Sequence, residues 1–338
     1  MNTKVLVTGG TGYIGSHTVV DLLDNGFDVI SIDNYYNSSP EALVQIESIT
    51  GKKVDNYAIN LVDLDAVRAV FKEHSDLVGI IHFAALKSVG ESVEKPLDYY
   101  GSNLNGLLNI LRCAAEFDVL NLIFSSSCSV YGNADELPVT ESTPMKEAES
   151  PYARTKQIGE FILQDYARAQ SDFNAVALRY FNPAGAHESA KMGESPTSNA
   201  SNLVPVITAT AIGKREKVVV FGDDYDTRDG SCIRDYIHIM DLANAHTKAL
   251  QYLIAKRNDS NYEIFNLGIG EGASVLEVIH AFEKVAEQPL NYEIGARRAG
   301  DVVAIYANKD HAMQRLDWQP TRSIEDIMRT AWAWEKVK

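Results

Sequence analysis

Cysteine is scarce in this chain, and its hydrophobic runs are short. Only three cysteines, Cys113, Cys128 and Cys232, occur among the 338 residues. Because they are odd in number and widely spaced, we expect neither a disulfide framework nor a cysteine-based zinc site. The eight histidines show no His-x-x-x-His spacing that would favour another metal site. The longest apolar runs, such as residues 78–86, are far too short to cross a membrane. A strand is predicted directly after Met1 and leaves no room for a signal peptide, so we expect a reducing, cytoplasmic location.

Positive charge is also in short supply. The chain has 31 lysine and arginine residues against 46 aspartate and glutamate residues, which gives a net charge of −15 at pH 7. This surplus of negative charge disfavours nucleic acid or an anionic membrane as the main partner. If the substrate is itself an anion, individual arginines must hold it against the unfavourable field.

Glycine is concentrated in one informative place, residues 9–15, where the sequence is Gly-Gly-Thr-Gly-Tyr-Ile-Gly. The apolar run before it predicts a short buried strand, and residues 16–23 after it predict a helix. A strand, a glycine-rich turn and a helix in this order offer backbone N–H groups and a helix N-terminus to a dinucleotide pyrophosphate. Gly10 opens the turn, Gly12 lets the phosphate approach the backbone, and Gly15 lets the helix pack closely on the sheet.

An acidic residue follows at the position that such a unit needs. Asp33 ends a second apolar run, residues 29–32, and lies 18 residues after Gly15, where its carboxylate can accept hydrogen bonds from the adenine-ribose hydroxyls. A carboxylate there repels the 2′-phosphate of NADP, and residues 34–36 contain no arginine or lysine to bind one. The predicted cofactor is therefore NAD. The alternative is a tight turn that closes an ordinary strand–helix unit, but the strand, the helix and Asp33 together favour a cofactor site.

The first half of the chain alternates strand-like and helix-like stretches. Strands are predicted over residues 4–8, 29–33, 56–60, 79–84, 121–126 and 175–180, and helices over residues 64–73, 99–117 and 152–170. This alternation predicts an α/β fold, a Rossmann-type doubly wound parallel sheet with helices on both faces. Ligands of such folds bind beyond the carboxyl ends of the strands.

The chain changes character from Phe181 onward, where glycine, proline, serine and asparagine mark a loop-rich connection. We therefore expect an NAD-binding Rossmann domain over residues 1–180 and a smaller, mixed α/β substrate-binding domain over residues 181–338. A helix over residues 237–250 and a strand over residues 263–267 are candidates to return to the main sheet.

A tyrosine and a lysine stand four residues apart at the start of one predicted helix. Residues i and i+4 share a helix face, so the side chains of Tyr152 and Lys156 can reach one site. A neighbouring ammonium and a positively charged nicotinamide ring favour the phenolate and lower its pKa. A shift of about three units from the ordinary value near 10 takes on the order of 4 kcal/mol. The alternative is a solvated pair on a helix surface.

Three serines, Ser125, Ser126 and Ser127, follow the apolar run of a predicted strand. They lie at the carboxyl edge of the predicted sheet, where a hydroxyl can bridge the substrate and Tyr152. Hydrogen bonding within the turn is the alternative role for one or two of them.

Taken together, these features resemble the extended short-chain dehydrogenase/reductase superfamily, and further segments resemble its UDP-glucose 4-epimerases. Those segments are His-Phe-Ala-Ala-Leu-Lys-Ser-Val-Gly-Glu-Ser at 82–92, Tyr-Tyr at 99–100 with Asn-Leu-Asn-Gly at 103–106, Arg-Tyr-Phe-Asn-Pro at 179–183, Asp-Gly at 229–230 with Arg-Asp-Tyr-Ile-His at 234–238, and Arg-Ala-Gly-Asp at 298–301. The resemblance runs from Val5 to about Trp334. It implies an NAD-dependent isomerase of galactose metabolism that interconverts UDP-galactose and UDP-glucose through a transient 4-keto sugar and bound NADH.

The resemblance also implies roles for individual residues. Tyr152 would be the catalytic base, Ser127 its proton-relay partner, and Lys156 the residue that holds the nicotinamide ribose and tunes Tyr152. The residues implied to bind NAD are Gly9, Gly12, Tyr13, Ile14, Gly15, Asp33, Asn34, Asn60, Leu61, Phe83, Ala84, Lys87, Asn103, Ser125, Tyr152, Lys156 and Tyr180. Those implied to bind the UDP-sugar are Lys87, Ser127, Tyr152, Asn182, Asn202, Leu203, Phe221, Arg234, Tyr236, Arg298, Asp301 and Ile305. Arginine suits this task because its planar fork binds phosphate oxygens in pairs.

Two positions bear on specificity. The family usually carries an acid where this chain has Asn60, so we expect weaker discrimination near adenine but no loss of binding. Ile305 stands where the family sets the size of the sugar pocket. Small residues there resemble enzymes that accept N-acetylhexosamines, and tyrosine resembles enzymes restricted to unsubstituted hexoses. Isoleucine is intermediate in volume, so we expect a preference for UDP-glucose and UDP-galactose with weak activity on the N-acetyl pair.

Apolar stripes at helical spacing run along two of the predicted helices. Their residues are Leu104, Leu107, Leu108 and Leu111 on the first helix and Ile158, Phe161 and Ile162 on the second. Packing inside one subunit explains part of each stripe. The family resemblance implies that two such helix pairs meet as the four-helix bundle of a homodimer.

Other functions stay open at this point. A nucleotide-sugar 4,6-dehydratase shares the fold, the cofactor and the Tyr–Lys pair, but it needs an acid and a base beyond the tyrosine, and residues 125–129 contain only serine and cysteine. A UDP-sugar decarboxylase and an epimerase acting mainly on N-acetylated UDP-hexosamines are further candidates. A non-catalytic, NAD-sensing regulator could dispense with Tyr152, Lys156 or Ser127, yet all three are present.

Overall fold

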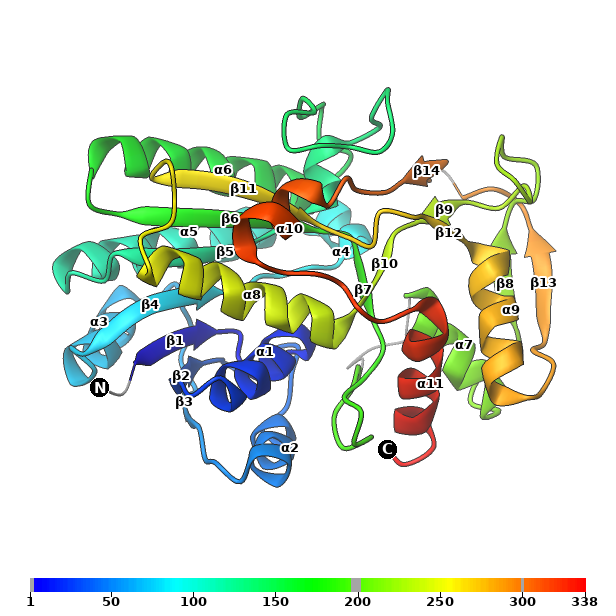
Figure 1. Cartoon of the computed structure of the whole chain (residues 1–338), viewed down its shortest axis with the longest axis horizontal. Helices are drawn as coiled ribbons and strands as arrows, with labels where there is room; N and C mark the ends of the chain where they lie inside the picture. The colour runs from blue at the N-terminus through cyan, green and yellow to red at the C-terminus, as the bar shows by residue number, and fades with distance from the viewer. Residues whose placement is uncertain (1–2, 196–201, 299–300) are drawn as a thin grey trace.

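Seven parallel strands form the main sheet of the protein (Figure 1). In spatial order they are β11 (Tyr262–Leu267), β6 (Asn174–Tyr180), β5 (Asn121–Ser127), β4 (Leu77–His82), β1 (Lys4–Thr8), β2 (Asp28–Ile32) and β3 (Asp55–Tyr57). The computed structural model describes residues 3–195, 202–298 and 301–338. Residues 299–300 of the Arg-Ala-Gly-Asp motif lie outside that part. The six strands predicted for the first half are present, and the doubly wound α/β fold is confirmed.

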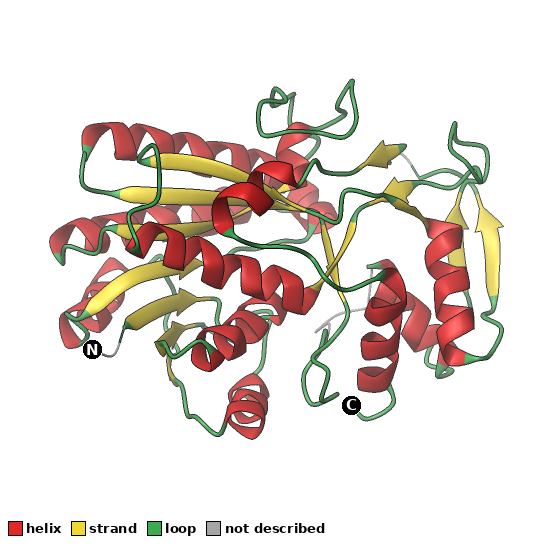
Figure 2. Cartoon of the chain, viewed as in Figure 1, coloured by secondary structure: helices red, strands yellow, loops and turns green. Residues whose placement is uncertain are grey.

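Helices cover both faces of this sheet (Figure 2). One face carries α1 (Tyr13–Asp24), α2 (Glu41–Thr50), α8 (Ile239–Ile254) and α10 (Asp310–Leu316), and the other carries α3 (Leu64–Glu73), α5 (Pro96–Glu116) and α6 (Pro151–Ala169). A short helix, α4 (Val89–Glu94), precedes α5. Side chains alternate between the faces along a strand: Val5 and Val7 pack under α1 and α8, whereas Leu6 packs under α3 and α5. Strands buried on both faces are almost continuously apolar, which is why they could be predicted.

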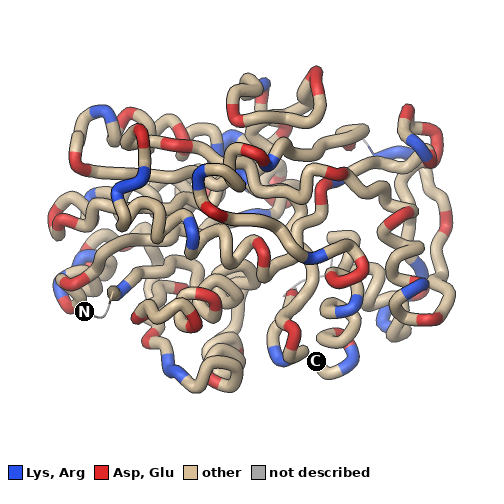
Figure 3. Tube along the Cα trace, viewed as in Figure 1, with Lys and Arg blue, Asp and Glu red and all other residues tan. Residues whose placement is uncertain are grey.

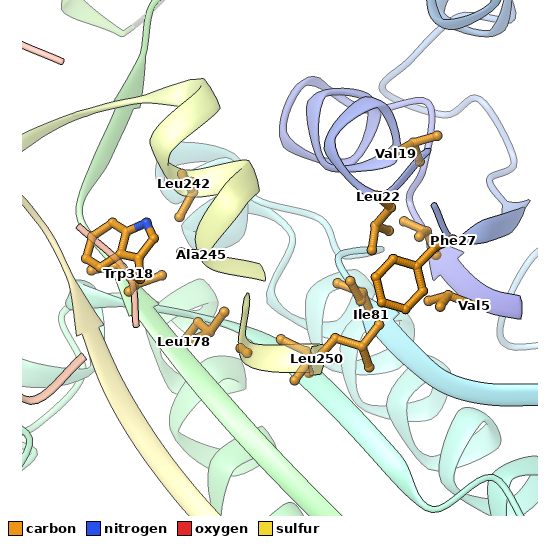
Figure 4. Close-up of a cluster of buried hydrophobic side chains, with 14 of the residues drawn as sticks. Val5, Val19, Leu22, Phe27, Ile81, Leu178, Leu242, Ala245, Leu250 and Trp318 are labelled. Atoms are coloured by element: carbon orange, nitrogen blue, oxygen red, sulfur yellow. The ribbon is translucent and has the colours of Figure 1, made fainter. Parts of the chain in front are cut away.

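The core on the first face joins parts of the chain that are far apart in sequence (Figure 4). Val5 of β1, Leu22 of α1 and Leu250 of α8 are fully buried in it. Trp318, which follows α10, closes the same core, and its indole nitrogen donates a hydrogen bond of 2.8 Å to the backbone oxygen of Asp241. The late segments α8, β11 and α10 therefore pack with the first 180 residues. The division into two domains stays a prediction, in which these late segments belong to the first domain.

The remaining elements gather at one end of the main sheet (Figure 1). Short strands pair there as β7 (Asn182–Ala184) with β10 (Tyr236–His238), β8 (Val218–Phe221) with β13 (Tyr292–Gly295), and β9 (Ile233–Arg234) with both β12 (Ala273–Ser274) and β14 (Ala304–Ile305). The helices are α7 (Leu203–Ala211), α9 (Val275–Ala286) and α11 (Ile324–Glu335). A separate apolar core, which includes Ile207, Phe282 and Ile327, holds these helices together.

Charged side chains are spread over the whole trace and are not collected on one segment (Figure 3). None of the helices in the described part of the chain combines the length and the apolarity needed to cross a membrane. Cys113, Cys128 and Cys232 are not paired with one another.

Candidate active site

A cavity of about 770 Å³ lies at the carboxyl ends of the main-sheet strands. The glycine-rich turn, the loops after β2, β3 and β4, the ends of β5 and β6 and the first turns of α5 and α6 form one side. Pro183, Glu194 and Asn202 contribute from the other. The predicted site residues that line this cavity are Gly9, Gly12, Tyr13, Ile14, Gly15, Asp33, Asn34, Asn60, Leu61, Phe83, Ala84, Lys87, Ser125, Ser127, Tyr152, Lys156, Tyr180 and Asn202. A volume of this size is within the range of small-molecule and cofactor sites.

The glycine-rich turn presents bare backbone to the cavity. Helix α1 begins after Gly12 without a side-chain cap, and its first turn contains no acidic residue. Its first N–H groups and the positive end of its dipole are therefore available to an anion. A Cβ atom added to Gly15 would lie 2.0 Å from the backbone oxygen of Gly9, which itself has a φ of 74°. Glycine at both positions thus permits the tight approach that a pyrophosphate requires.

Asp33 lies just beyond the end of β2, where the loop holds its carboxylate in place. One oxygen accepts a hydrogen bond from the backbone N–H of Thr11 at 3.2 Å, and the other accepts from Tyr35 N at 2.9 Å and Ser38 Oγ at 2.9 Å. A carboxylate offers about four acceptor positions. The three bonds orient Asp33 and leave acceptor capacity for the hydroxyls of a ribose.

Helix α6 places Tyr152 and Lys156 one turn apart on the cavity wall. The helix begins here because the side chain of Ser150 caps the N–H of Ala153 at 3.2 Å and Pro151 occupies the first turn. The Lys156 ammonium lies 5.8 Å from the centre of the Tyr152 ring and donates a hydrogen bond of 2.6 Å to the backbone oxygen of Ser125. The Tyr–Lys pair is therefore not a solvated pair on a helix surface.

Burial acts against the charged forms of both side chains. Loss of water raises the pKa of Tyr152 to about 12, against a smaller lowering by Ser127. The same effect lowers the pKa of Lys156 to about 8, against a smaller raising by the Glu160 carboxylate. Desolvation is thus the largest influence on the pKa of Tyr152 in the chain alone. The predicted lowering depends on the Lys156 ammonium and the cation of a bound nicotinamide acting together, and it stays a prediction.

The three serines at the end of β5 have different partners. The Ser125 hydroxyl hydrogen-bonds the Tyr180 hydroxyl, and the Ser126 hydroxyl donates to Glu160. The Ser127 hydroxyl accepts from the N–H of Ser129 at 3.2 Å. Ser127 therefore makes a turn-type hydrogen bond and also faces Tyr152, whereas Ser126 is turned into the interior.

A second group of predicted residues forms a cluster outside the cavity lining. The Asp301 carboxylate accepts a hydrogen bond of 2.6 Å from Arg298 and lies 3.7 Å from the Arg234 guanidinium. The Arg298 guanidinium also lies 5.4 Å from the centre of the Phe221 ring. Two arginines share one carboxylate here, so the cluster has a positive charge in excess, which suits an anionic ligand.

The other residues predicted to contact ligands lie around these two groups. Ile305 pairs with Arg234 between β14 and β9, and it is buried in the same apolar cluster as Phe181, which lines the cavity. Tyr236 lies in the core beside α7, α9 and α11. The N–H of Asn182 donates to the backbone of Asp235, and Leu203 is the first residue of α7.

Asn103 lies behind the cavity lining, and its side chain has partners within the protein. Its amide oxygen accepts from the N–H of Leu86 at 2.8 Å, and its amide nitrogen donates to the oxygen of Leu86 at 3.0 Å and to the hydroxyl of Thr155 at 3.1 Å. The side chain thus ties the loop after β4 to α6, and a contact of Asn103 with NAD stays a prediction.

The cavity residues that were not assigned a role from the sequence include Ser38, Phe181, Pro183 and Glu194. Phe181 and Pro183 belong to the Arg-Tyr-Phe-Asn-Pro segment, so that segment carried a usable signal. Ser38 and Glu194 are isolated polar residues in loops, and no local pattern identifies them. Burial raises the pKa of the Glu194 carboxyl, and the Lys87 ammonium opposes this rise.

Comparisons with known proteins agree with this arrangement over the whole chain. The model of the GDP-mannose 4,6-dehydratase family matches residues 6–331. The UDP-glucose 4-epimerase of Erwinia amylovora is 47% identical over 332 residues, which cover 98% of this chain and 97% of that protein. The UDP-glucose 4-epimerase of Bifidobacterium longum, solved in complex with NAD⁺ and UDP, has a TM-score of 0.93 and 45% identity and covers 99% of this chain and 98% of its own. The UDP-glucose-4-epimerase of Stenotrophomonas maltophila, solved with NAD and formylated UDP-arabinopyranose, has a TM-score of 0.95 and 42% identity, with coverage of 99% and 98%.

Replacement of Gly15 by alanine tests the pyrophosphate cradle. The added Cβ overlaps the backbone oxygen of Gly9, so we expect Gly15→Ala to lower the affinity for NAD, the cofactor predicted from the sequence, at least tenfold. Overpacking of this kind also costs about 1–3 kcal/mol of stability. Gly90→Ala is the matched control, because a Cβ at Gly90 meets nothing within 4 Å. Calorimetric titration with NAD measures both variants after bound cofactor has been removed, and equal affinities for NAD would contradict the assignment.

Proposed function

Because the chain belongs to the GDP-mannose 4,6-dehydratase family and, within it, to the UDP-glucose 4-epimerases, we propose that it interconverts UDP-glucose and UDP-galactose by inverting C4 of the hexose. The observation that carries the proposal is that Tyr152, Lys156 and Ser127 line the same cavity as the uncapped glycine-rich turn. The relatives solved with NAD and with UDP or a UDP-sugar support both ligands. A 4,6-dehydratase is disfavoured because residues 125–129 offer no acid beside the tyrosine.

The cofactor site fits NAD along its length. The turn at residues 9–15 would hold the pyrophosphate, Asp33 the adenine ribose and Lys156 the nicotinamide ribose. When bound, NAD⁺ supplies the group that accepts a hydride from C4 of the sugar and returns it. Since each turnover regenerates the oxidised cofactor, we expect NAD to stay bound between turnovers.

The chain's own residues move the proton and hold the substrate. Tyr152, as phenolate, takes the proton of the 4-hydroxyl, with Ser127 in the proton path, and later gives that proton back to the oxygen on C4. The 4-keto sugar must turn its other face before the hydride returns, so it has to be held loosely while the nucleotide is held firmly. The cluster of Arg234 and Arg298 supplies the firm contacts, because its excess positive charge attracts the anionic nucleotide although the protein as a whole has a negative net charge.

The first experiment supplies purified protein with UDP-galactose and no added NAD and follows UDP-glucose by chromatography. We expect conversion, and we expect Tyr152→Phe to slow it by a factor of about 10²–10⁴, the usual contribution of a positioned base. Tyr166→Phe, on the same helix and half-buried against Phe173, is the control and should keep its rate. Absence of conversion even after NAD is added would contradict the epimerase.

The size of the sugar pocket is set in part by Ile305. The side chain is buried beside Phe181, and it leaves less room than a small residue at that place would. We expect kcat/KM for UDP-N-acetylglucosamine to be at least tenfold below that for UDP-glucose, and Ile305→Ala to narrow this ratio. The ratio is insensitive to the fraction of folded enzyme, so it separates specificity from stability. Comparable turnover of both sugars by the unaltered protein would show the preference to be wrong.

A homodimer is proposed through α5 and α6. Leu107 and Leu111 are buried in their own core, but Phe161 remains 53% exposed. Leu104, Leu108, Ile158 and Ile162 are half-buried. A face of this kind supports pairing of the two helices with those of a second copy.

Light scattering tests this assembly. We expect a dimer at micromolar concentration and a monomer for Phe161→Glu, because a carboxylate on an apolar interface is not solvated. Val44→Glu is the control, since Val44 is an apolar residue that is also exposed, on α2. A monomeric unaltered protein would contradict the proposed dimer.

The proposed location is the reducing cytoplasm. The cysteines are unpaired, which is the usual state there. Burial raises the pKa of Cys128, next to Ser127, to about 12, so its thiol stays protonated beside the reacting groups.

A further inference from the structure

Behind the cavity wall, α6 and β6 are joined by a buried ion pair. The side chains of Glu160 and Arg179 are 1% and 3% exposed. The guanidinium donates to both carboxylate oxygens, at 2.9 Å from Nε to Oε1 and 2.6 Å from Nη2 to Oε2. Burying two charges costs several kcal/mol per ion before their attraction is counted. Because this cost offsets much of the stability that the pair can contribute, and because α6 carries Tyr152 and Lys156, we expect a role of the pair other than stabilisation.

The pair is fully hydrogen-bonded to the elements around it. Glu160 also accepts hydrogen bonds from the Ser126 hydroxyl on β5 and from the Tyr262 hydroxyl on β11, the latter at 3.2 Å. Arg179 donates to the Tyr131 hydroxyl at 3.0 Å. One carboxylate on α6 thus holds three neighbouring strands in register with the helix.

Glu160 is linked to the catalytic helix face by spacing and by charge. It lies one turn after Lys156 and two turns after Tyr152 on α6, so all three share a face. On β5, Ser126 bonds the Glu160 carboxylate, while the backbone oxygen of the preceding residue accepts the Lys156 ammonium. The carboxylate therefore acts on Lys156 through space and through the position of the strand.

The other titratable groups around Lys156 and Tyr152 are neutral near pH 7. Burial and the Lys156 charge lower the pKa of His82 on β4 to about 3, and its Nδ1 lies 2.8 Å from the Thr8 hydroxyl. Burial raises the pKa of four further groups, Cys128 and Tyr131 after β5, Tyr180 on β6 and Tyr262 on β11. Lys156, Arg179 and Glu160 are the charged side chains buried between α6, β5 and β6, with one positive charge in excess, which a phenolate at Tyr152 balances. Further out, Glu141 acts on Tyr131, and Arg234 and Asp235 act on Cys128.

We propose that Glu160 is a positioning residue for the epimerisation. Held by its ion pair with Arg179, it fixes α6 on β5, and its negative charge keeps Lys156 protonated beside a Tyr152 phenolate. This inference rests on the proposed function. It assigns a catalytic consequence to a pair that touches neither substrate nor cofactor.

The variant Glu160→Gln keeps the size of the side chain and removes its charge. Loss of a nearby negative charge favours the deprotonated forms of both Lys156 and Tyr152, so both pKa values fall. In the holoenzyme the acid limb of the rate profile reports Tyr152 and the basic limb reports Lys156. We expect the basic limb to move to lower pH by about one unit, the shift that a charge one helix turn away produces. The acid limb reports Tyr152, which is two turns away, so it should move in the same direction by a smaller amount.

The control is Asp165→Asn, which removes a carboxylate from an exposed position of the same helix and should leave both limbs in place. A merely structural role for Glu160 would lower the amplitude of the profile without moving it. A second readout is an ultraviolet titration of the tyrosinate band, with Tyr152→Phe as the blank, which should show the same downward shift. Absence of conversion by the unaltered protein would defeat the proposed function, whereas normal conversion with unmoved limbs in Glu160→Gln would defeat this inference alone.

A double variant keeps the test available if Glu160→Gln leaves Arg179 unpaired and does not fold. Glu160→Gln with Arg179→Gln replaces both charges by amides that can bond each other, and removal of both partners is tolerated better than removal of one. Of the two charges, that of Glu160 is the one that acts on the pKa of Lys156, so its loss still dominates, and both limbs should move to lower pH by a smaller amount. Limbs that stay at the pH of the unaltered protein would overturn the proposal.

Discussion

The close packing of α6 against β5 determines where every reactive group lies. Gly159 permits it, because a Cβ at that position would lie 2.7 Å from the ring of Phe124 on β5. Glu160 then joins α6 to β5 through the Ser126 hydroxyl and to β6 through Arg179. The first turn of α6 consequently projects beyond the sheet edge, beside the serines that end β5. A helix held even slightly further out would separate Tyr152 from Ser127, and a small displacement of this kind is costly in catalysis.

Much of this arrangement could be predicted from the sequence, because its signals are local. The strands are apolar on both faces, as Val5, Leu6 and Val7 show. The glycine-rich turn and the Tyr–Lys pair are each contained in a segment of seven residues or fewer. The errors at strand ends have a local cause as well. The strand predicted over residues 56–60 ends at Tyr57, because the side chain of Asn60 accepts a hydrogen bond from Val62 N and so begins a turn.

What could not be predicted depends on residues distant in sequence. The raised pKa of Tyr152 comes from desolvation by elements that close over it only in the folded chain. Glu160 and Arg179 are individually ordinary charged residues, and nothing near either one indicates that both are buried. Glu194 reaches the cavity from the loop after β7, far from any motif. The local motifs and the family resemblance that they carry therefore indicate the reaction, while the electrostatic conditions under which it runs are a property of the tertiary structure.

The late return of β11 to the main sheet has a consequence for the order in which the protein is made. β11 covers the edge of β6, and the two strands are about 80 residues apart in the chain. While a ribosome synthesises that stretch, the backbone N–H and C=O groups along one side of β6 have no strand to pair with. An exposed strand edge of this kind attracts other nascent chains. The cofactor-binding half therefore becomes safe from such pairing only once most of the polypeptide has been synthesised, although its recognisable motifs are among the first residues to emerge.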